Sequence, residues 1–226
     1  MTTTSEKWFE QFCGSMKLQW ARIPEETSRT PDYLLTIKGQ TVVVEVKEIV
    51  RNESEQKSDR LLAERGYGEL LGNTPGDRVR KKINDSAGQI KARSQGVYPS
   101  ILVLCDIAFG AGQVAGNLDP YNVRVGMYGL EQVHIALPID RSQGPQYAGT
   151  SFGPKRKMTE QHNTSISAIG VLSTPKADDI RLHIYHNRYA AVPLIDGLLA
   201  PLGVPQYRLS DDVYGGAADW VEVVVG

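Results

Sequence analysis

Cysteine, net charge and long apolar runs are all scarce in this sequence. Its 226 residues contain only two cysteines, Cys13 and Cys105, which are too few for a disulfide framework or a cysteine-based zinc site. The formal net charge is −1, so a nucleic-acid partner would have to be held by a local basic patch or through a metal. No apolar run reaches the roughly 18 residues of a membrane span, and the first residues lack a signal-peptide pattern. We therefore expect a cytoplasmic protein with no membrane partner.

What the sequence does contain is typical of one globular α/β domain. Apolar residues make up 41% of the chain and charged residues 23%, and 226 residues are enough to bury a sizeable core. We predict a single domain over residues 1–226, with a mixed central β-sheet flanked by helices. The predicted helices cover about 5–16 (with Ser5 as the N-cap), 54–65 and 77–95. The predicted strands cover 33–37, 41–46, 100–106, 132–139, 165–172, 180–186 and 220–225, with loops over 109–128 (apart from a short strand near Val123) and 141–163.

The stretch PDYLLTIKGQTVVVEVK, residues 31–47, predicts a β-hairpin. Its two apolar-rich runs flank a turn at Lys38 and Gly39, and glycine suits the positive φ that a type I′ turn requires there. In this register the numbers of paired residues sum to 77, which places Asp32 opposite Glu45. Directly opposed side chains of an antiparallel pair have Cβ atoms about 4.5–5.5 Å apart. The two carboxylates are therefore expected to be neighbours.

The two-residue period of a strand gives this hairpin one apolar and one polar face. The apolar face, which we expect to be buried, consists of Tyr33, Leu35, Ile37, Val42, Val44 and Val46. The other face gathers Asp32, Glu45 and Lys47 at the end away from the turn. Opposed carboxylates repel each other unless a cation neutralises them, and either a divalent metal or Lys47 would do so. An alternative interpretation is a merely solvated polar face on which Lys47 pairs with Glu45.

Residues 77–95 predict an amphipathic helix, with Gly76 and Asp77 at its start and Gly96 after its end. At about 100° per residue, Val79, Ile83, Ala87 and Ile90 form the apolar stripe, and Arg78, Lys82, Gln89 and Arg93 form a neighbouring stripe. This segment has six basic and two acidic residues, a local charge of +4. The polar stripe is either a solvated surface or a surface that faces phosphates. The next strand, 100–106, is expected to be central and parallel to the second hairpin strand.

With these elements in this order, the chain resembles the PD-(D/E)XK nuclease superfamily. The residues that carry the resemblance are Pro31–Asp32 and then Glu45–Val46–Lys47. Phe9–Glu10 in the preceding helix and Gln89–Ile90–Lys91 in the following helix support it. The resemblance covers roughly residues 5–106. It implies a restriction endonuclease-like core in that region, followed by a C-terminal β-rich elaboration over about 107–226.

The resemblance also implies an activity. It suggests a Mg²⁺-dependent nuclease that hydrolyses DNA phosphodiester bonds, as an endonuclease of restriction or defence type, and by analogy a homodimer. The alternative is a non-catalytic nucleic-acid-binding or assembly module that retains the nuclease fold. Under the first interpretation Asp32, Glu45 and the backbone carbonyl of Val46 would bind Mg²⁺, for which Mn²⁺ may substitute.

The remaining site residues receive their roles from the same resemblance. Lys47 would orient the attacking water or stabilise the transition state. Glu10 matches an acidic helix position near the metal, and Gln89 matches a position that contacts the site. Basic residues of the 77–95 helix would contact DNA: Arg78, Lys82, Lys91 and Arg93.

Overall fold

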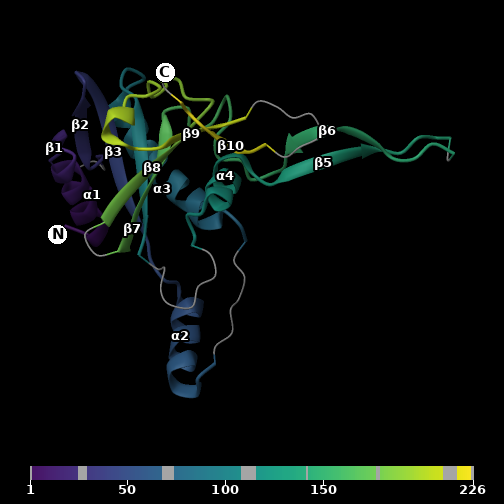
Figure 1. Ribbon diagram of the computed structural model, residues 1–226, viewed down its shortest axis with the longest axis horizontal. Helices are drawn as coiled ribbons and strands as arrows, with labels where there is room; N and C mark the ends of the chain where they lie inside the picture. Colours follow the sequence, from purple (N-terminus) through teal and green to yellow (C-terminus); the bar gives the residue numbers. More distant parts are fainter. Residues whose placement is uncertain are drawn as a thin grey trace.

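The computed structural model describes residues 2–24, 30–67, 74–107, 116–140, 142–176, 179–210 and 218–224. An eight-stranded mixed sheet runs through it, with the order β1-β2-β3-β4-β7-β8-β9-β10 (Figure 1). The strands are β1 (Gln19–Arg22), β2 (Tyr33–Ile37), β3 (Gln40–Ile49), β4 (Ser100–Asp106), β7 (Ala168–Lys176), β8 (Asp179–His186), β9 (Gln206–Leu209) and β10 (Trp220–Glu222). The pairs β3–β4, β4–β7 and β8–β9 are parallel and the others antiparallel. The predicted α/β class with a mixed central sheet is confirmed.

Helices cover both faces of this sheet, and the central strand β4 is buried on both sides. On one face, α1 (Thr4–Ser15) contributes Phe9 and Phe12 to a core that includes Tyr33 and Val44. On the other face, α3 (Asp77–Ser94) and α4 (Pro120–Tyr128) pack over β4 and its neighbours. The apolar side chains of this second core include Val79, Ile83, Ile90, Leu102, Leu104, Val123 and Met127. The strand β4 is buried along almost its whole length, as the continuous apolar run predicted.

The β2–β3 hairpin has the predicted register. Tyr33 pairs with Val44 and Ile37 pairs with Gln40, so paired numbers sum to 77. Lys38 and Gly39 have φ values of 50° and 79°, the two positive values of a type I′ turn. The second strand extends further than predicted, to Ile49, because its end pairs with β4 after β2 has stopped. The carboxyl end of β3 is therefore open on the β2 side.

The N-terminal end of α1 differs from the prediction. The N-cap of α1 is Thr3 rather than Ser5, and Thr3 forms a capping box with Glu6.

The helix α3 starts after Gly76, which lies so close to α4 that an added Cβ would be 2.4 Å from the backbone nitrogen of Gly126. Glycine at both positions lets the start of α3 pack directly on α4 and fixes α3 over the sheet.

Two local predictions in the C-terminal half are wrong, and one strand there was not predicted. The short strand expected near Val123 is α4, whose N-cap is Asp119 and whose first residue is Pro120. The loop expected over 141–163 contains β6 (Gln146–Phe152), which pairs with β5 (Glu131–Ala136) in a separate two-stranded sheet. The strand β9 was not predicted; it is only four residues long and pairs with β8 and β10. A short 3₁₀ helix, Ala200–Leu202, precedes it.

Two segments stand apart from the main sheet (Figure 1). The helix α2 (Glu53–Arg65) follows β3, begins at a capping box of Asn52 with Glu55, and has no buried residue. The β5–β6 ribbon projects away from the sheet on the side opposite α1. Among the helices of the described residues, none has the length and apolar character to cross a membrane.

Candidate functional site

The end of the β2–β3 ladder brings Asp32 to Glu45. The last backbone pair of the hairpin is Tyr33 with Val44. One position further, Oδ2 of Asp32 accepts a hydrogen bond of 2.7 Å from the amide of Val46, while its carbonyl accepts one of 2.9 Å from the amide of Ile23. The Asp32 side chain thus takes the place of the next rung of the ladder and lies against β3 beside Glu45, as the predicted register requires.

Glu45 is completely buried beside Lys47. Its side chain has no exposed surface, and its Oε1 is 2.5 Å from Nζ of Lys47, whose side chain is partly exposed near the carboxyl end of β3. Apart from this ion pair, neither carboxylate oxygen of Glu45 has a hydrogen-bond partner among the described residues. A buried carboxylate without hydrogen bonds is unusual, because ionised groups need several donors when water is removed. These oxygens are therefore available to an additional cation or donor.

The electrostatics of the pair show a shortage of positive charge. Burial and the charge of the neighbouring Asp32 raise the pKa of Glu45 to about 7, although Lys47 acts to lower it. Burial also raises the pKa of Asp32, against the hydrogen bond from Val46 and the charge of Lys47. One ammonium does not offset two carboxylates in this position, so the pair retains protons that an exposed pair would lose.

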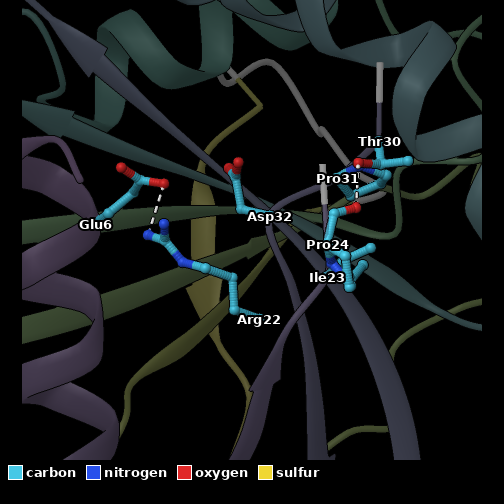
Figure 2. Close-up of a pocket in the computed structure, with 7 residues that line it drawn as sticks. All are labelled: Glu6, Arg22, Ile23, Pro24, Thr30, Pro31 and Asp32. Atoms are coloured by element: carbon cyan, nitrogen blue, oxygen red, sulfur yellow. Dashed lines mark hydrogen bonds and ion pairs between the residues drawn. The ribbon is translucent and has the colours of Figure 1, made fainter. Parts of the chain in front are cut away.

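A pocket of about 420 Å³ opens beside Asp32, between the start of α1 and the β1–β2 edge. Figure 2 shows Glu6 projecting from α1 toward the guanidinium of Arg22, with Asp32 on an adjacent side of the pocket. Nη2 of Arg22 is 2.9 Å from Oε1 of Glu6 and donates to the hydroxyl of Tyr33, also at 2.9 Å. The charge of Glu6 contributes to the raised pKa of Asp32. Glu6 is therefore a third carboxylate close to the pair.

Glu10, the acidic helix residue that the resemblance singled out, lies one turn further along α1. Its Oε1 accepts a hydrogen bond of 2.8 Å from the hydroxyl of Tyr33 and lies 3.4 Å from Arg22. It does not line the pocket that Glu6 and Asp32 share. Sequence reasoning missed Glu6, although its position four residues before Glu10 put it on the same side of the helix.

Two residues of the polar stripe on α3 face the site. Nε2 of Gln89 donates a hydrogen bond of 3.1 Å to the carbonyl of Thr30, in the segment that leads into Asp32. Lys82 lies within the electrostatic reach of Lys47 and Glu48. Burial lowers the pKa of Lys82, and Lys47 lowers it further. The predicted stripe is thus turned toward the end of the hairpin.

The other three basic residues predicted to bind nucleic acid have different surroundings. Arg78 forms an ion pair of 2.5 Å with Glu55 and donates to the carbonyl of Val50, which joins α3 to the start of α2. Lys91 and Arg93 are exposed at the far end of α3. Of these four residues, Lys82 is the one whose charge interacts with Lys47, next to the carboxylate pair.

No three side chains of His, Cys, Asp or Glu gather as a metal-binding group anywhere in the described parts of the chain. A metal at this site would therefore take two protein carboxylates, a backbone carbonyl and oxygens from water or substrate. The backbone amide of Val43 donates to the carbonyl of Pro99, on the β4 side of β3, whereas the amide of Val46 donates to Asp32, on the β2 side. Since the two polar groups of a strand residue point the same way, the Val46 carbonyl is directed toward Asp32.

Comparison with known proteins adds nothing to this geometry: no family model, curated protein or solved structure matches the chain. The site must therefore be interpreted from its own residues.

Proposed function

We propose that this chain is a Mg²⁺-dependent nuclease that hydrolyses DNA phosphodiester bonds, acting as an endonuclease of restriction or defence type. The observation that carries the proposal is the fully buried Glu45, set beside Asp32 at the open end of β3 with Lys47 at 2.5 Å. Burial of two adjacent carboxylates is costly unless a cation joins them. Such an arrangement at the edge of a pocket is typical of a site that binds a divalent ion.

The residues present fit Mg²⁺ or Mn²⁺. Apart from the Lys47 ammonium, the oxygens of Glu45 have no partner among the described residues, and Asp32 presents a second carboxylate. With the carbonyl of Val46 these are hard oxygen donors, and Mg²⁺ is commonly bound through one or two carboxylates together with water and phosphate. When bound, the ion would lower the pKa of a water molecule and offset negative charge on the phosphate.

The chain's own residues would supply the remaining functions. Lys47 holds an ammonium between Glu45 and solvent, where it would donate to the phosphate oxygen on which charge develops. Gln89 fixes the segment before Asp32 by bonding the Thr30 carbonyl. Lys82 adds a second positive charge on the α3 side, which favours a polyanionic substrate.

The order of elements supports a restriction endonuclease-like core and hence membership of the PD-(D/E)XK superfamily. A helix, a β-hairpin, a crossover helix and a parallel strand follow one another as α1, β2–β3, α3 and β4. The residues Pro31–Asp32 and Glu45–Val46–Lys47 stand at the end of the hairpin in this order.

A cleavage assay tests the proposal. The purified chain is incubated with supercoiled plasmid, linear duplex, single-stranded DNA and RNA, in Mg²⁺, Mn²⁺ or EDTA. We expect cleavage of at least one DNA in Mg²⁺ or Mn²⁺ and none in EDTA, with linear product from plasmid because an endonuclease needs no free end. Asp32→Ala and Lys47→Ala should each reduce the rate by at least about 100-fold.

The matched control is Asp196→Ala, which removes an exposed carboxylate paired with Arg208 far from the site. This variant should cleave at the wild-type rate. Activity that survives Asp32→Ala or Lys47→Ala would remove the site assignment. Binding of DNA without cleavage under every condition would instead favour the non-catalytic binding module.

A further inference from the structure

A serine hydroxyl in the middle of α3 is buried without a partner. The side chain of Ser86 has no exposed surface, and its Oγ forms no hydrogen bond with any described residue. The carboxylate oxygens of Glu45 are in the same position, apart from the ion pair with Lys47. Buried polar groups are nearly always hydrogen-bonded, so each exception needs an explanation. Here α3 packs on β3, so the two exceptions lie in adjoining elements.

Glu45 and Lys47 lie on the face of the sheet that α3 covers. They pair with Leu102 and Leu104 of β4. Both leucines belong to the core that α3 forms with the sheet. Because directly paired residues share a face, the Glu45 carboxylate is on the α3 side of β3.

Ser86 in turn lies on the side of α3 that faces the end of the hairpin. Lys82, Ser86 and Gln89 have the spacing i, i+4 and i+7, which places them along one side of a helix. The charge of Lys82 interacts with that of Lys47. Gln89 donates a hydrogen bond of 3.1 Å to the carbonyl of Thr30. Both ends of this row therefore lie beside the hairpin, with Ser86 between them.

The spacing along the two elements brings Ser86 to Glu45. The helix α3 connects the parallel strands β3 and β4, so it runs antiparallel to β3. The step from Lys82 to Ser86 is about 6 Å along the helix axis. The step from Lys47 back to Glu45 is about 6.6 Å along the strand. With Lys82 beside Lys47, Ser86 is therefore beside Glu45.

We propose that Ser86 is a positioning residue for Glu45: its hydroxyl donates a hydrogen bond to the Glu45 carboxylate and fixes its orientation toward Asp32. A serine re-aims its hydroxyl by rotation about χ1 alone, and a carboxylate accepts several such bonds. Groups that bind metals are usually oriented by partners of this kind. The consequence for metal affinity rests on the proposed function, whereas the hydrogen bond itself does not.

A double-mutant cycle in EDTA tests the hydrogen bond without metal or activity. Ser86→Ala is made in the wild type and in Glu45→Leu, and urea denaturation at pH 8 gives the equilibrium constant of unfolding. We expect Ser86→Ala to raise this constant by about 10-fold in the wild type, because a carboxylate loses a donor. In Glu45→Leu, which has no acceptor, the same change should raise it by less than about threefold.

Ser94→Ala is the matched control. Ser94 is also buried on α3, and its hydroxyl has no partner among the described residues. It lies about 12 Å beyond Ser86 along the helix axis, away from Glu45. Its replacement should therefore have the same effect in both backgrounds. Equal coupling of Ser86 and Ser94 to Glu45 would overturn the proposal.

Titration calorimetry with Mn²⁺ measures the consequence for the metal. Ser86→Ala should raise the Kd for Mn²⁺ by about 10-fold, and Ser94→Ala should leave it within about threefold. An unchanged Kd in Ser86→Ala, or an additive cycle in a chain that binds Mn²⁺, would overturn the role of Ser86 and leave the proposed function intact. A coupled cycle in a chain that binds no Mn²⁺ would support the hydrogen bond and overturn the metal-dependent function instead.

Discussion

Oδ2 of Asp32 accepts a hydrogen bond of 2.7 Å from the amide of Val46, so a side chain completes the hairpin ladder where β2 has ended. This bond fixes Asp32 beside Glu45, whose carboxylate is buried and paired only with Lys47 among the described residues. The fold therefore holds two carboxylates together with one cation. We expect its stability and its response to pH to depend on this imbalance.

The first prediction concerns stability as a function of pH. Glu45 has an ordinary pKa of 4.5 and one of about 7 in the fold, so between these values the folded state binds more protons than the unfolded chain. The free energy of unfolding should therefore fall as pH rises from about 4.5 through 7, by up to about 3 kcal/mol. Glu45→Gln removes this group and should flatten the dependence. Urea denaturation at pH 5 and pH 8 in EDTA measures both proteins.

The control for this measurement is Glu160→Gln, which removes an exposed carboxylate outside the β2–β3 hairpin and should leave the pH dependence unchanged. The same slope in Glu45→Gln as in the wild type would show that another group is responsible.

The second prediction concerns metal-induced stabilisation at pH 8, where Glu45 is ionised. A ligand at 10 to 100 times its Kd stabilises the folded state by about 1.4 to 2.7 kcal/mol, which corresponds to an increase in Tm of about 3–10 °C for a chain of this size. Mg²⁺ or Mn²⁺ should produce this increase in the wild type. Asp32→Asn should lose most of it, because one of the two carboxylates becomes a neutral amide. Thermal unfolding followed by circular dichroism is sufficient, and an undiminished shift in Asp32→Asn would contradict the site.

Much of the hairpin and its neighbours could be predicted from the sequence because the signals there are local. Gly39 marks the turn, the turn sets the register, and the register places Asp32 against Glu45. The helix α3 and the strand β4 likewise follow from their own periodicity and apolar content.

The rest depends on contacts between distant segments. Glu6 and Arg22 meet because α1 docks against the β1–β2 edge, and no local pattern specifies that contact. In contrast, the start of α4 has a local sequence signal, because Asp119 followed by Pro120 is typical of a helix N-terminus. We predicted a short strand there instead. The strand β6 contains Gly149 beside a register shift in the ladder and has a polar face, so its sequence resembles a loop.

The third prediction separates Glu6 from Glu10. Both are on α1 and both contact Arg22, but only Glu6 lines the pocket with Asp32, while Glu10 accepts from the Tyr33 hydroxyl. Glu6→Gln should raise the Mg²⁺ concentration needed for half-maximal cleavage by about 10-fold, because a charge near the ion is lost. Glu10→Gln should change it by less than about threefold. Cleavage rates over a Mg²⁺ titration compare them, and a larger effect of Glu10→Gln would return the role to the residue that the resemblance indicated.

The fourth prediction tests whether α3 presents a phosphate-binding stripe or a solvated surface. Lys82 faces Lys47 and Glu48, whereas its neighbour Lys81 is exposed to solvent on the same helix. If the stripe contacts phosphate, Lys82→Met should weaken duplex binding and reduce the slope of log K against log salt by about one, and Lys81→Met should change neither. Fluorescence anisotropy in EDTA measures binding without cleavage. Equal slopes for the wild type and Lys82→Met would mean that the charge of α3 is structural, and the substrate would then have to be held from the Arg22 side of the pocket.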